Sequence, residues 1–268
     1  MFTRKKFIES TGRLLGWAVT CRVLSTDFSA RAAPNAQSLL AASDAIRNPN
    51  QPFKVTVTLT EFEKGTQTDS STLLSYSRTL DNSGQFASLI QFVQPARDAG
   101  KLMLKHGNDL WFFDPGTKAS VRLSPQQRLM GQASNGDVVT VNFAKDYQAT
   151  LAAEEAITDG ERKPRRAYKL ALVAASPDAT YAGIELWIDV DNQRPLKAKF
   201  LAESGRLLKT AYYRRFQSQL GAERPTETVI IDGLNPQSVT LLRFTDFVAR
   251  NVPTTWFQRD YLPRFQPE

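Results

Sequence analysis

Residues 53–60 read Phe53-Lys54-Val55-Thr56-Val57-Thr58-Leu59-Thr60. Apolar and polar side chains alternate along this stretch, and successive side chains of a β-strand point to opposite faces. The pattern therefore predicts a strand with one face buried and the other toward water. Similar alternation recurs along most of the chain, and it decides the fold class.

Further strand patterns follow at intervals of roughly 8–14 residues, separated by turn sequences such as Asp81-Asn82-Ser83-Gly84. Because few helical patterns intervene, the strands are expected to form an antiparallel meander, and so wide a sheet must curl or close. The sequence thus predicts a mainly β protein with a few short helices. The expected strands are 73–80, 86–93, 101–105, 109–113, 118–123, 167–174, 181–190, 195–201, 207–216, 226–232 and 238–248.

One short helix is expected before the first strand. Apolar residues of segment 35–47 lie close to one helical face, and Asn48-Pro49 would end the helix. The strand rhythm breaks again between residues 125 and 156. There, residues 126–130 suit a helical turn, and residues 144–155 fit either a helix or a strand.

The first 33 residues differ from the rest. A basic start, an apolar centre too short to span a bilayer and the small-x-small pattern Ala30-Arg31-Ala32 follow in the order of a cleaved signal peptide. We expect cleavage near Ala32 or Ala33, which leaves residues 34–268 as a single domain. No linker or repeat divides that part of the chain.

The route of export stays open. Residues 3–8 resemble a twin-arginine signal in which Lys5 replaces the second arginine. Cys21 is a candidate lipoprotein cysteine, but the residue before it is Thr20 rather than a small residue. Arg22 interrupts the apolar run and argues against a retained membrane anchor.

The composition excludes several classes of function. With one histidine and one cysteine among 268 residues, the chain cannot build a disulfide framework or a zinc site with several His or Cys ligands. The formal net charge is +7, but residues 1–32 carry six basic and two acidic residues, so cleavage would lower it to +3. A nucleic-acid partner therefore has little support.

Catalytic motifs are also missing from the sequence. It has no glycine-rich phosphate loop, nucleophile elbow or metalloprotease helix. His106 lies in an expected hairpin turn, where a histidine is ordinarily solvated. Three carboxylate pairs remain as candidates for hydrolase chemistry, and we interpret the second and third as solvated strand ends: Glu154/Glu155, Asp189/Asp191 and Glu61/Glu63. We therefore predict that the protein is not an enzyme and needs no cofactor or metal.

The run Trp111-Phe112-Phe113 is the most informative aromatic group. Along a strand, Trp111 and Phe113 share one face and Phe112 takes the other, so both faces require apolar cover. One interpretation is a core on one face and a helix or loop over the other. The other is a curled sheet whose concave face forms a cavity for an acyl chain.

Several motifs occur together in an order typical of one family. Within residues 94–147 they are Gln94-Pro95-Ala96-Arg97-Asp98-Ala99-Gly100, Leu110-Trp111-Phe112-Phe113-Asp114-Pro115, Arg122, Gln126-Gln127-Arg128-Leu129-Met130-Gly131, Gly136-Asp137-Val138, Asn142-Phe143 and Asp146-Tyr147. Further along are Tyr181–Asp189, Arg194-Pro195-Leu196-Lys197 and Gly205-Arg206-Leu207-Leu208-Lys209. In these residues the chain resembles the LolA-like outer-membrane lipoprotein-sorting family, in its uncharacterised periplasmic branch.

The resemblance implies an incomplete antiparallel barrel closed by short helices, with an apolar interior that shelters lipid. It implies a monomeric periplasmic carrier that binds a lipid or an acylated lipoprotein, contacts a membrane transiently and has an inner-membrane transporter as partner. Length and segment 130–138 depart from the founding lipoprotein carrier. The alternative is an accessory protein of an envelope export complex, with the same fold and a filled interior.

Candidate site residues follow from the carrier hypothesis. Apolar residues of this region are expected to line the cavity, with methionine suited to an adaptable pocket, although each of them also suits ordinary core packing: Trp111, Phe113, Leu123, Met130, Val138 and Phe143. Three arginines are candidates for contacts with an anionic head group, although exposed arginines are ordinarily solvated: Arg97, Arg122 and Arg128.

Overall fold

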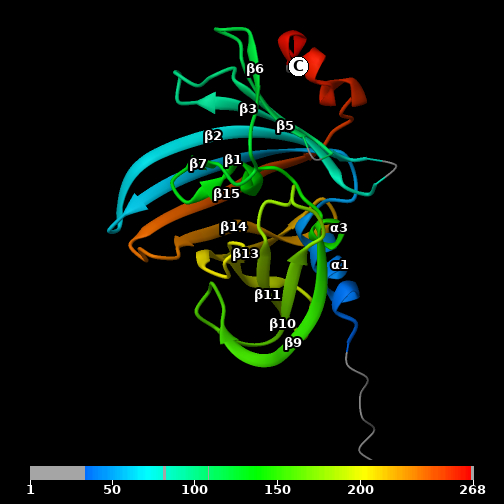
Figure 1. Ribbon diagram of the computed structural model, residues 1–268, viewed down its shortest axis with the longest axis vertical. Coiled ribbons are helices and arrows are strands. Elements are labelled where there is room, and N and C mark those ends of the chain that lie inside the picture. The colour runs from blue at the N-terminus through cyan, green and yellow to red at the C-terminus, as the bar shows by residue number, and fades with distance from the viewer. Residues whose placement is uncertain (1–33, 81–82, 108, 267–268) are drawn as a thin grey trace, which may run out of the picture. The chain divides into compact units, whose positions relative to one another are not determined.

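One large curled antiparallel sheet organises the computed structural model, which describes residues 34–80, 83–107 and 109–266 (Figure 1). The predicted signal peptide, residues 1–33, lies outside the described residues, and the division into signal peptide and single domain stays a prediction. The described residues are mainly β with a few short helices, as the sequence pattern predicts.

The helices are α1 (Ala36–Arg47), α2 (Asn135–Val138), α3 (Phe143–Asp146) and the 3₁₀ turns η1 (Thr254–Phe257) and η2 (Arg259–Arg264). The strands are β1 (Phe53–Glu63), β2 (Thr66–Thr79), β3 (Phe86–Gln94), β4 (Leu102–His106), β5 (Asp109–Asp114), β6 (Ala119–Arg122), β7 (Arg128–Met130), β8 (Ala133–Ser134), β9 (Tyr147–Thr158), β10 (Pro164–Ala174), β11 (Gly183–Asp189), β12 (Pro195–Leu201), β13 (Leu207–Gln219), β14 (Ala222–Asp232) and β15 (Ser238–Ala249).

The order of the strands explains how the sheet stays open. Thirteen of the described strands pair in the order β6-β5-β4-β3-β2-β1-β15-β14-β13-β12-β11-β10-β9. Strands β6 and β9 therefore form its two edges, while the first and last strands in the chain, β1 and β15, pair in its middle. The sheet curls without closing, which is an incomplete barrel.

Strand β1 shows why these residues form a sheet. Its side chains Phe53, Val55, Val57 and Leu59 are buried on the concave face, and the residues between them are half-buried on the other face. A shift of the register by one residue would turn all four away from the core, so the alternation fixes the pairing. The predicted strand at residues 53–60 is confirmed.

Helix α1 packs against β9, β12 and β14 and against α3. Its first turn is capped by Asn35, whose Oδ1 accepts a hydrogen bond from the Ser38 amide at 2.9 Å. Leu39 and Leu40 are buried on its inner side. The helix ends at Arg47, before Pro49, as the sequence predicts.

A bridging segment, defined as residues 123–146, connects the two edges of the sheet. It leaves β6 at one edge, passes through β7, β8, α2 and α3, and enters β9 at the other edge. Figure 1 shows β7 and the helical turn after it lying in front of the sheet. The chain between the edge strands therefore covers the concave face.

One expectation for this segment needs correction, and one open alternative is settled. Residues 126–130 do not form a helical turn, because Arg128 and Met130 pair with Ser134 and Ala133 in the two-stranded sheet β7–β8. Residues 144–155 are helical only to Asp146 and then become the edge strand β9. Hydrogen bonding to a neighbour decided the structure in both places.

The buried apolar residues form two main groups on the two faces of the sheet. The first cluster fills the concave face and includes Val57, Leu59, Ile184, Ile230 and Leu242 together with apolar residues of the bridging segment. The second cluster lies on the opposite face of β2–β5. It packs Tyr76, Leu89, Leu104 and Phe113 under Trp256, Phe257 and Leu262 of the C-terminal cover, which we define as residues 250–266.

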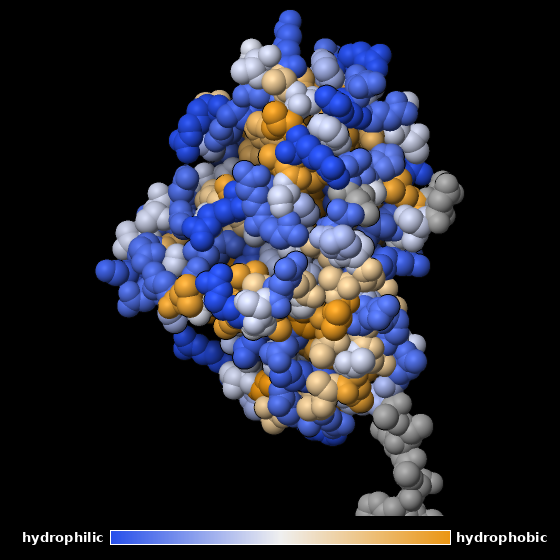
Figure 2. Space-filling model, in the orientation of Figure 1, coloured by the Kyte–Doolittle hydropathy of each residue, from blue (hydrophilic) through white to orange (hydrophobic). Residues whose placement is uncertain are grey.

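Large apolar side chains are rarely exposed. Figure 2 shows a mostly hydrophilic face with apolar groups gathered in its upper part and in its lower half. The exposed large apolar residues among those described come from separate elements: Val93, Val121, Val173, Leu234 and Val248. No described helix is long and apolar enough to cross a membrane.

Candidate functional site

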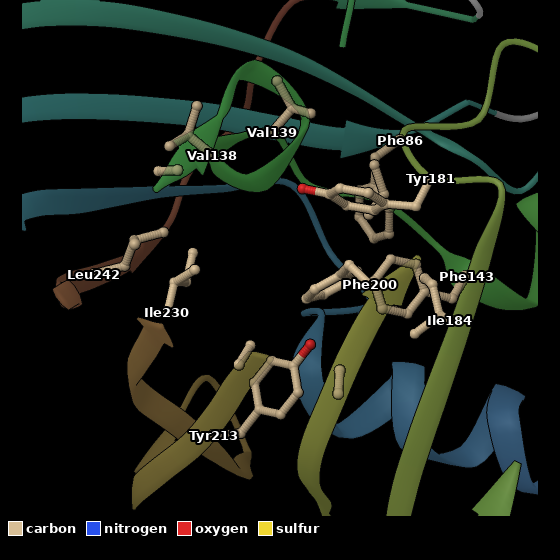
Figure 3. Close-up of a cluster of buried hydrophobic side chains, with 14 of the residues drawn as sticks. Phe86, Val138, Val139, Phe143, Tyr181, Ile184, Phe200, Tyr213, Ile230 and Leu242 are labelled. Carbon is tan, nitrogen blue, oxygen red and sulfur yellow. The ribbon is translucent and has the colours of Figure 1, made fainter. Parts of the chain in front are cut away.

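An apolar cavity of about 130 Å³ lies between the concave face of the sheet and the bridging segment. In Figure 3, Val138 and Val139 of the bridging segment lie across this space from Ile230 and Leu242 of the sheet. The lining residues include Val55, Val57, Val138, Val139, Phe143, Phe200, Ala211, Ile230 and Leu242.

The polar side chains in the wall are uncharged or paired, and they are Arg47, Asn48, Ser75, Asp137, Thr140, Thr180, Tyr181, Tyr213 and Thr228. Tyr213 lines the cavity, and burial raises the pKa of its hydroxyl. Tyr213 therefore stays protonated at neutral pH and adds no charge. The charged members, Arg47 and Asp137, face partners described below. The cavity can accept an apolar molecule without leaving an ion unpaired.

The second half of the bridging segment is fastened to α1. The Val141 carbonyl accepts hydrogen bonds from Asn48 Nδ2 at 2.8 Å and from Arg47 Nη2 at 3.1 Å. The Arg47 guanidinium also lies 3.9 Å from the centre of the Phe143 ring. The end of α1 therefore holds the backbone of the segment over one end of the cavity.

Asp44 strengthens this attachment from the previous turn of α1. Its Oδ2 accepts the Ala144 amide at 2.7 Å, and its other oxygen pairs with Arg47 at 2.5 Å. Burial raises the pKa of Asp44, although Arg47 and the Ala144 amide oppose that shift. This carboxyl therefore takes up a proton more readily than a solvated one.

Strands β2 and β3 provide a further set of contacts. The Thr140 hydroxyl bonds to that of Ser77 at 2.8 Å, and the Thr140 amide donates to Ser88 Oγ at 3.2 Å. The Asn142 amide donates to Gln85 Oε1 at 2.8 Å. These contacts are polar, and they add to the apolar packing of Val138, Val139 and Phe143 in the first cluster.

The first half of the segment is held by a buried ion pair. Asp137 in α2 contacts Lys209 of β13, and their side chains are 10% and 5% exposed. The Lys209 ammonium also donates to the Gln132 carbonyl at 3.0 Å and to Ser134 Oγ at 3.2 Å. The Tyr181 hydroxyl donates to the second oxygen of Asp137 at 2.7 Å. Burial raises the pKa of Tyr181, which keeps it a donor.

Two glycines allow the segment to lie this close to the sheet. Gly131 has φ +51°, and a Cβ there would lie 2.3 Å from Thr240 Oγ1. A Cβ at Gly136 would lie 2.3 Å from Thr180 Oγ1. Any side chain at either position would push the segment away from its support.

A second, polar pocket of about 260 Å³ lies beside the ion pair. It shares Tyr181 with the apolar cavity, so the two spaces adjoin on either side of the Asp137–Lys209 contact. Arg128 and Arg206 are exposed members of its wall, and Asp232 contributes a carboxylate.

The structure brings only two of the predicted apolar site residues to the cavity. Val138 and Phe143 line it. Leu123 and Met130 pack against the first cluster without lining the cavity, and Met130 borders a separate cleft that also contains Arg97. A role in ligand binding stays a prediction for Val138 and Phe143.

Trp111 and Phe113 lie on the other face of the sheet, which corrects the prediction that they line the cavity. Both belong to the second cluster, and Arg259 of the C-terminal cover lies 4.2 Å from the Trp111 ring centre. Phe112 packs with the first cluster instead. The alternation across the strand is confirmed, but it could not show which face is concave.

The three arginines occupy different places. Arg97 lies within 3.8 Å of Asp69 and 3.6 Å of Asp98, and Arg122 pairs with Asp109 at 2.8 Å. These carboxylates partly neutralise both side chains. Arg128 is the one of the three that lines the polar pocket beside the cavity.

The carboxylate candidates have structural partners. Asp189 is buried rather than solvated, because its Oδ1 accepts the Asp191 amide at 2.8 Å in the turn after β11. Glu154 pairs with Arg166, and Glu155 accepts the Trp187 indole N–H at 2.5 Å. None of these carboxylates lines the apolar cavity.

His106 is exposed, and its ring supports the C-terminal cover, because Nδ1 bonds to the Phe257 carbonyl at 2.7 Å. Within residues 34–80, 83–107 and 109–266, no three His, Cys, Asp or Glu side chains are grouped to hold a metal ion.

The sequence did not identify the residues that attach the bridging segment to the sheet. Asp137 and Lys209 are 72 positions apart, and a charged residue at a strand position ordinarily indicates a solvated face. Asp137, Tyr181 and Lys209 do belong to the motifs typical of the family. That membership was the one available signal.

Comparison with solved structures decides the family. The crystal structure of the LolA superfamily protein NE2245 from Nitrosomonas europaea is 35% identical, covers 85% of this chain and 100% of its own, and superimposes with a TM-score of 0.76. The chain belongs to the LolA superfamily. A family model described as an uncharacterized protein matches residues 84–264 of this LolA-superfamily chain. No curated protein matches.

Two further solved structures share the fold of this LolA-superfamily protein. An outer membrane lipoprotein-sorting protein domain from Vibrio parahaemolyticus has 17% identity and a TM-score of 0.72, covering 85% of this chain and 98% of its own. A DUF1329 family protein from Desulfovibrio piger has 20% identity and a TM-score of 0.71, covering 84% and 97%.

Proposed function

We propose that this protein is a periplasmic carrier that shelters the acyl chains of a lipid or an acylated lipoprotein in its apolar cavity. The observation that supports the proposal most directly is the contrast between the cavity and the bridging segment that covers it. The cavity wall is apolar, whereas the bridging segment is attached to α1 and the sheet through polar groups that water or a ligand can replace.

The size of the cavity implies that the cover moves. Its 130 Å³ is close to the volume of an engineered cavity of about 150 Å³ that holds one benzene molecule. An acyl chain needs more room. We therefore take the observed arrangement as the closed form, from which residues 137–144 move outward when a chain enters.

Burial of an acyl chain supplies free energy, and outward movement of the bridging segment costs it. Each methylene buried contributes about 0.8 kcal/mol, so ten contribute about 8 kcal/mol before binding costs. Residues 138–144 are held by the hydrogen bonds to Arg47, Asn48, Asp44, Ser77, Ser88 and Gln85 described above, each of which contributes roughly 1 kcal/mol. Outward movement also exposes the buried side chains of Val138, Val139, Val141 and Phe143. Contacts of the acyl chain with these side chains have to replace that lost burial if the open form is to be stable.

The remaining parts of the proposal follow from the predicted signal peptide and from membership of the LolA superfamily. The protein works in the periplasm after removal of residues 1–33, as a monomer without cofactor or catalytic group. It contacts a membrane transiently and receives or delivers its cargo at an inner-membrane transporter. Membership of a superfamily that includes a lipoprotein-sorting domain supports this proposal.

Native mass spectrometry of the mature protein, purified without detergent and then mixed with monopalmitoylglycerol, tests the proposal. Ala211→Leu adds a branched side chain to the cavity wall, and we expect it to lower lipid uptake at least tenfold while the protein remains folded. Thr210→Leu is the matched control, because Thr210 is the neighbouring residue on β13 and faces the other side of the sheet.

A protein that carries no lipid and takes up none would overturn the carrier proposal. In that case the alternative, an accessory protein of an envelope export complex, would be favoured. Equal loss of uptake in the two leucine variants would show that the cavity is not the binding site.

A further inference from the structure

The contact between Asp137 and Lys209 joins the bridging segment, which moves in the proposed opening, to strand β13, which stays in place. Asp137 lies in α2 of the bridging segment, whereas Lys209 belongs to β13 and Tyr181 lies two residues before β11. Figure 3 shows the Tyr181 ring extending from the loop before β11 toward the bridging segment. If the bridging segment moves outward, Asp137 moves with it, whereas Lys209 and Tyr181 stay in place.

That departure would leave a buried cation with too few partners. Lys209 is 4% exposed, and two of its remaining acceptors, the Gln132 carbonyl and Ser134 Oγ, also belong to the bridging segment. The ammonium lies over the rings of Tyr181 and Phe200, 4.9 and 5.7 Å from their centres. Removing one partner of a buried ion pair is strongly unfavourable unless another anion replaces it.

The polar pocket beside the pair offers room for that anion. It has a volume of about 260 Å³ and adjoins the apolar cavity at Tyr181. Arg128 and Arg206 stand at its exposed side. The opposing carboxylate is Asp232, whose Oδ1 is already occupied by the amides of Leu234 and Asn235.

We propose that Asp137 occupies the position of an anionic lipid head group, which displaces it from Lys209 and Tyr181 when the acyl chain enters the cavity. This inference rests on the proposed carrier function and names the class of cargo, a lipid with a phosphate-type head group. The tail lies in the apolar cavity, and the head group lies in the polar pocket between Lys209, Arg128 and Arg206. Arginine and lysine side chains are well suited to phosphate oxygens.

The test compares three probes: lysophosphatidylglycerol and monopalmitoylglycerol, which share one palmitoyl tail but differ in head-group charge, and glycerol 3-phosphate, which has no tail. Titration of the mature protein should show at least tenfold tighter binding of the anionic lipid than of the neutral one. Lys209→Met should reduce that preference to about twofold. Lys199→Met is the matched control, because Lys199 lies on the opposite face of the sheet near Glu185 and Trp187.

Asp137→Asn should raise the affinity for the anionic lipid about tenfold, because the neutral amide competes poorly for Lys209. The double variant Lys209→Met/Asp137→Asn removes both charges. It keeps the test valid if Lys209→Met alone fails to fold, and it should show the same reduced preference of about twofold.

Equal binding of the two lipids by the unmodified protein would overturn the head-group inference and leave the carrier proposal standing. Binding of neither lipid would overturn the carrier proposal as well. If glycerol 3-phosphate binds as tightly as the anionic lipid, the pocket is a site for free phosphate esters, and the inference of lipid cargo is wrong.

Discussion

The concave and opposite faces of the sheet are both covered by irregular segments, but the two covers are built differently. The bridging segment is fastened by hydrogen bonds and a buried ion pair, and it leaves a cavity beneath it. The C-terminal cover inserts Trp256 and Phe257 into the sheet face, with the Trp256 ring centre 5.3 Å from Tyr76 and 4.8 Å from Phe265.

From this difference we infer that the C-terminal cover supports the structure and that the bridging segment serves the function. Aromatic rings packed edge to face fill the space beneath the C-terminal cover, so that cover contributes mainly to stability. The bridging segment combines apolar contacts with polar ones, and the polar ones can be exchanged for a ligand. Substitutions under the C-terminal cover should therefore change mainly the stability, whereas substitutions around the bridging segment should change lipid uptake.

The largest effect is expected for Trp256→Ala. Loss of this buried ring should lower the free energy of unfolding by about 3–5 kcal/mol, as large aromatic deletions do. Urea denaturation measures the loss, and lipid uptake by the folded fraction should be unchanged. Phe143→Ala should cost less because one side of its ring already borders the cavity, and it should alter uptake. Loss of uptake in folded Trp256→Ala would contradict the division between the two faces.

A smaller, matched pair of changes removes one hydrogen bond from each cover. Asn48 donates to the Val141 carbonyl, and His106 bonds to that of Phe257. Asn48→Ala and His106→Ala should each cost about 1 kcal/mol of stability. Hydrogen exchange should quicken in the bridging segment for the first variant and in the C-terminal cover for the second. Only Asn48→Ala should accelerate lipid uptake, and faster uptake in His106→Ala would count against the comparison.

The smallest effect concerns Asp146 at the end of the bridging segment. Burial raises its pKa, although the Gln85 amide, 2.8 Å away, and Lys105 oppose the shift. The folded state therefore binds its proton more tightly than the unfolded chain, and stability falls as the pH rises above the ordinary value of 3.8. Asp146→Asn should raise Tm by about 2 °C at pH 7.

Thermal unfolding followed from pH 7 downward checks the sign of this effect. The difference between Asp146→Asn and the unmodified protein should shrink as the pH falls toward 3.8 and should level off below that value, where the carboxyl is protonated in both states. The negative charge of Asp146 also helps to raise the pKa of Asp44, so the difference reports Asp146 together with this coupling. A difference that grows toward acid pH would show that the carboxylate is stabilised in the fold.

Much of the fold could be predicted from the alternation of side chains. Strand β1, the hairpin of β4 and β5, and helix α1 all lie where the pattern places them. The pattern failed where a partner distant in sequence decided the structure. Residues 128–130 form a strand because they pair with 133–134.

The candidate site was harder to predict for the same reason. Alternation places Trp111 and Phe113 on one face, but only the direction of curl decides which face encloses the cavity. Asp137 and Lys209 meet because β13 and the bridging segment adjoin in space. No periodicity contains that information, so only the motifs typical of the family pointed to this region.

The pairing of β1 with β15 has a consequence for how the protein folds. It joins residues 53–63 to residues 238–249. Every other pairing in the large sheet joins two strands that are consecutive in the chain. Hairpins in the two halves of the chain can form early, but this seam must wait for the last strand, because closing so long a loop is slow. Until then β1 and β15 are two unprotected edges that can recruit strands from other chains. The middle of the finished sheet is thus the point where the newly made chain is most exposed to aggregation.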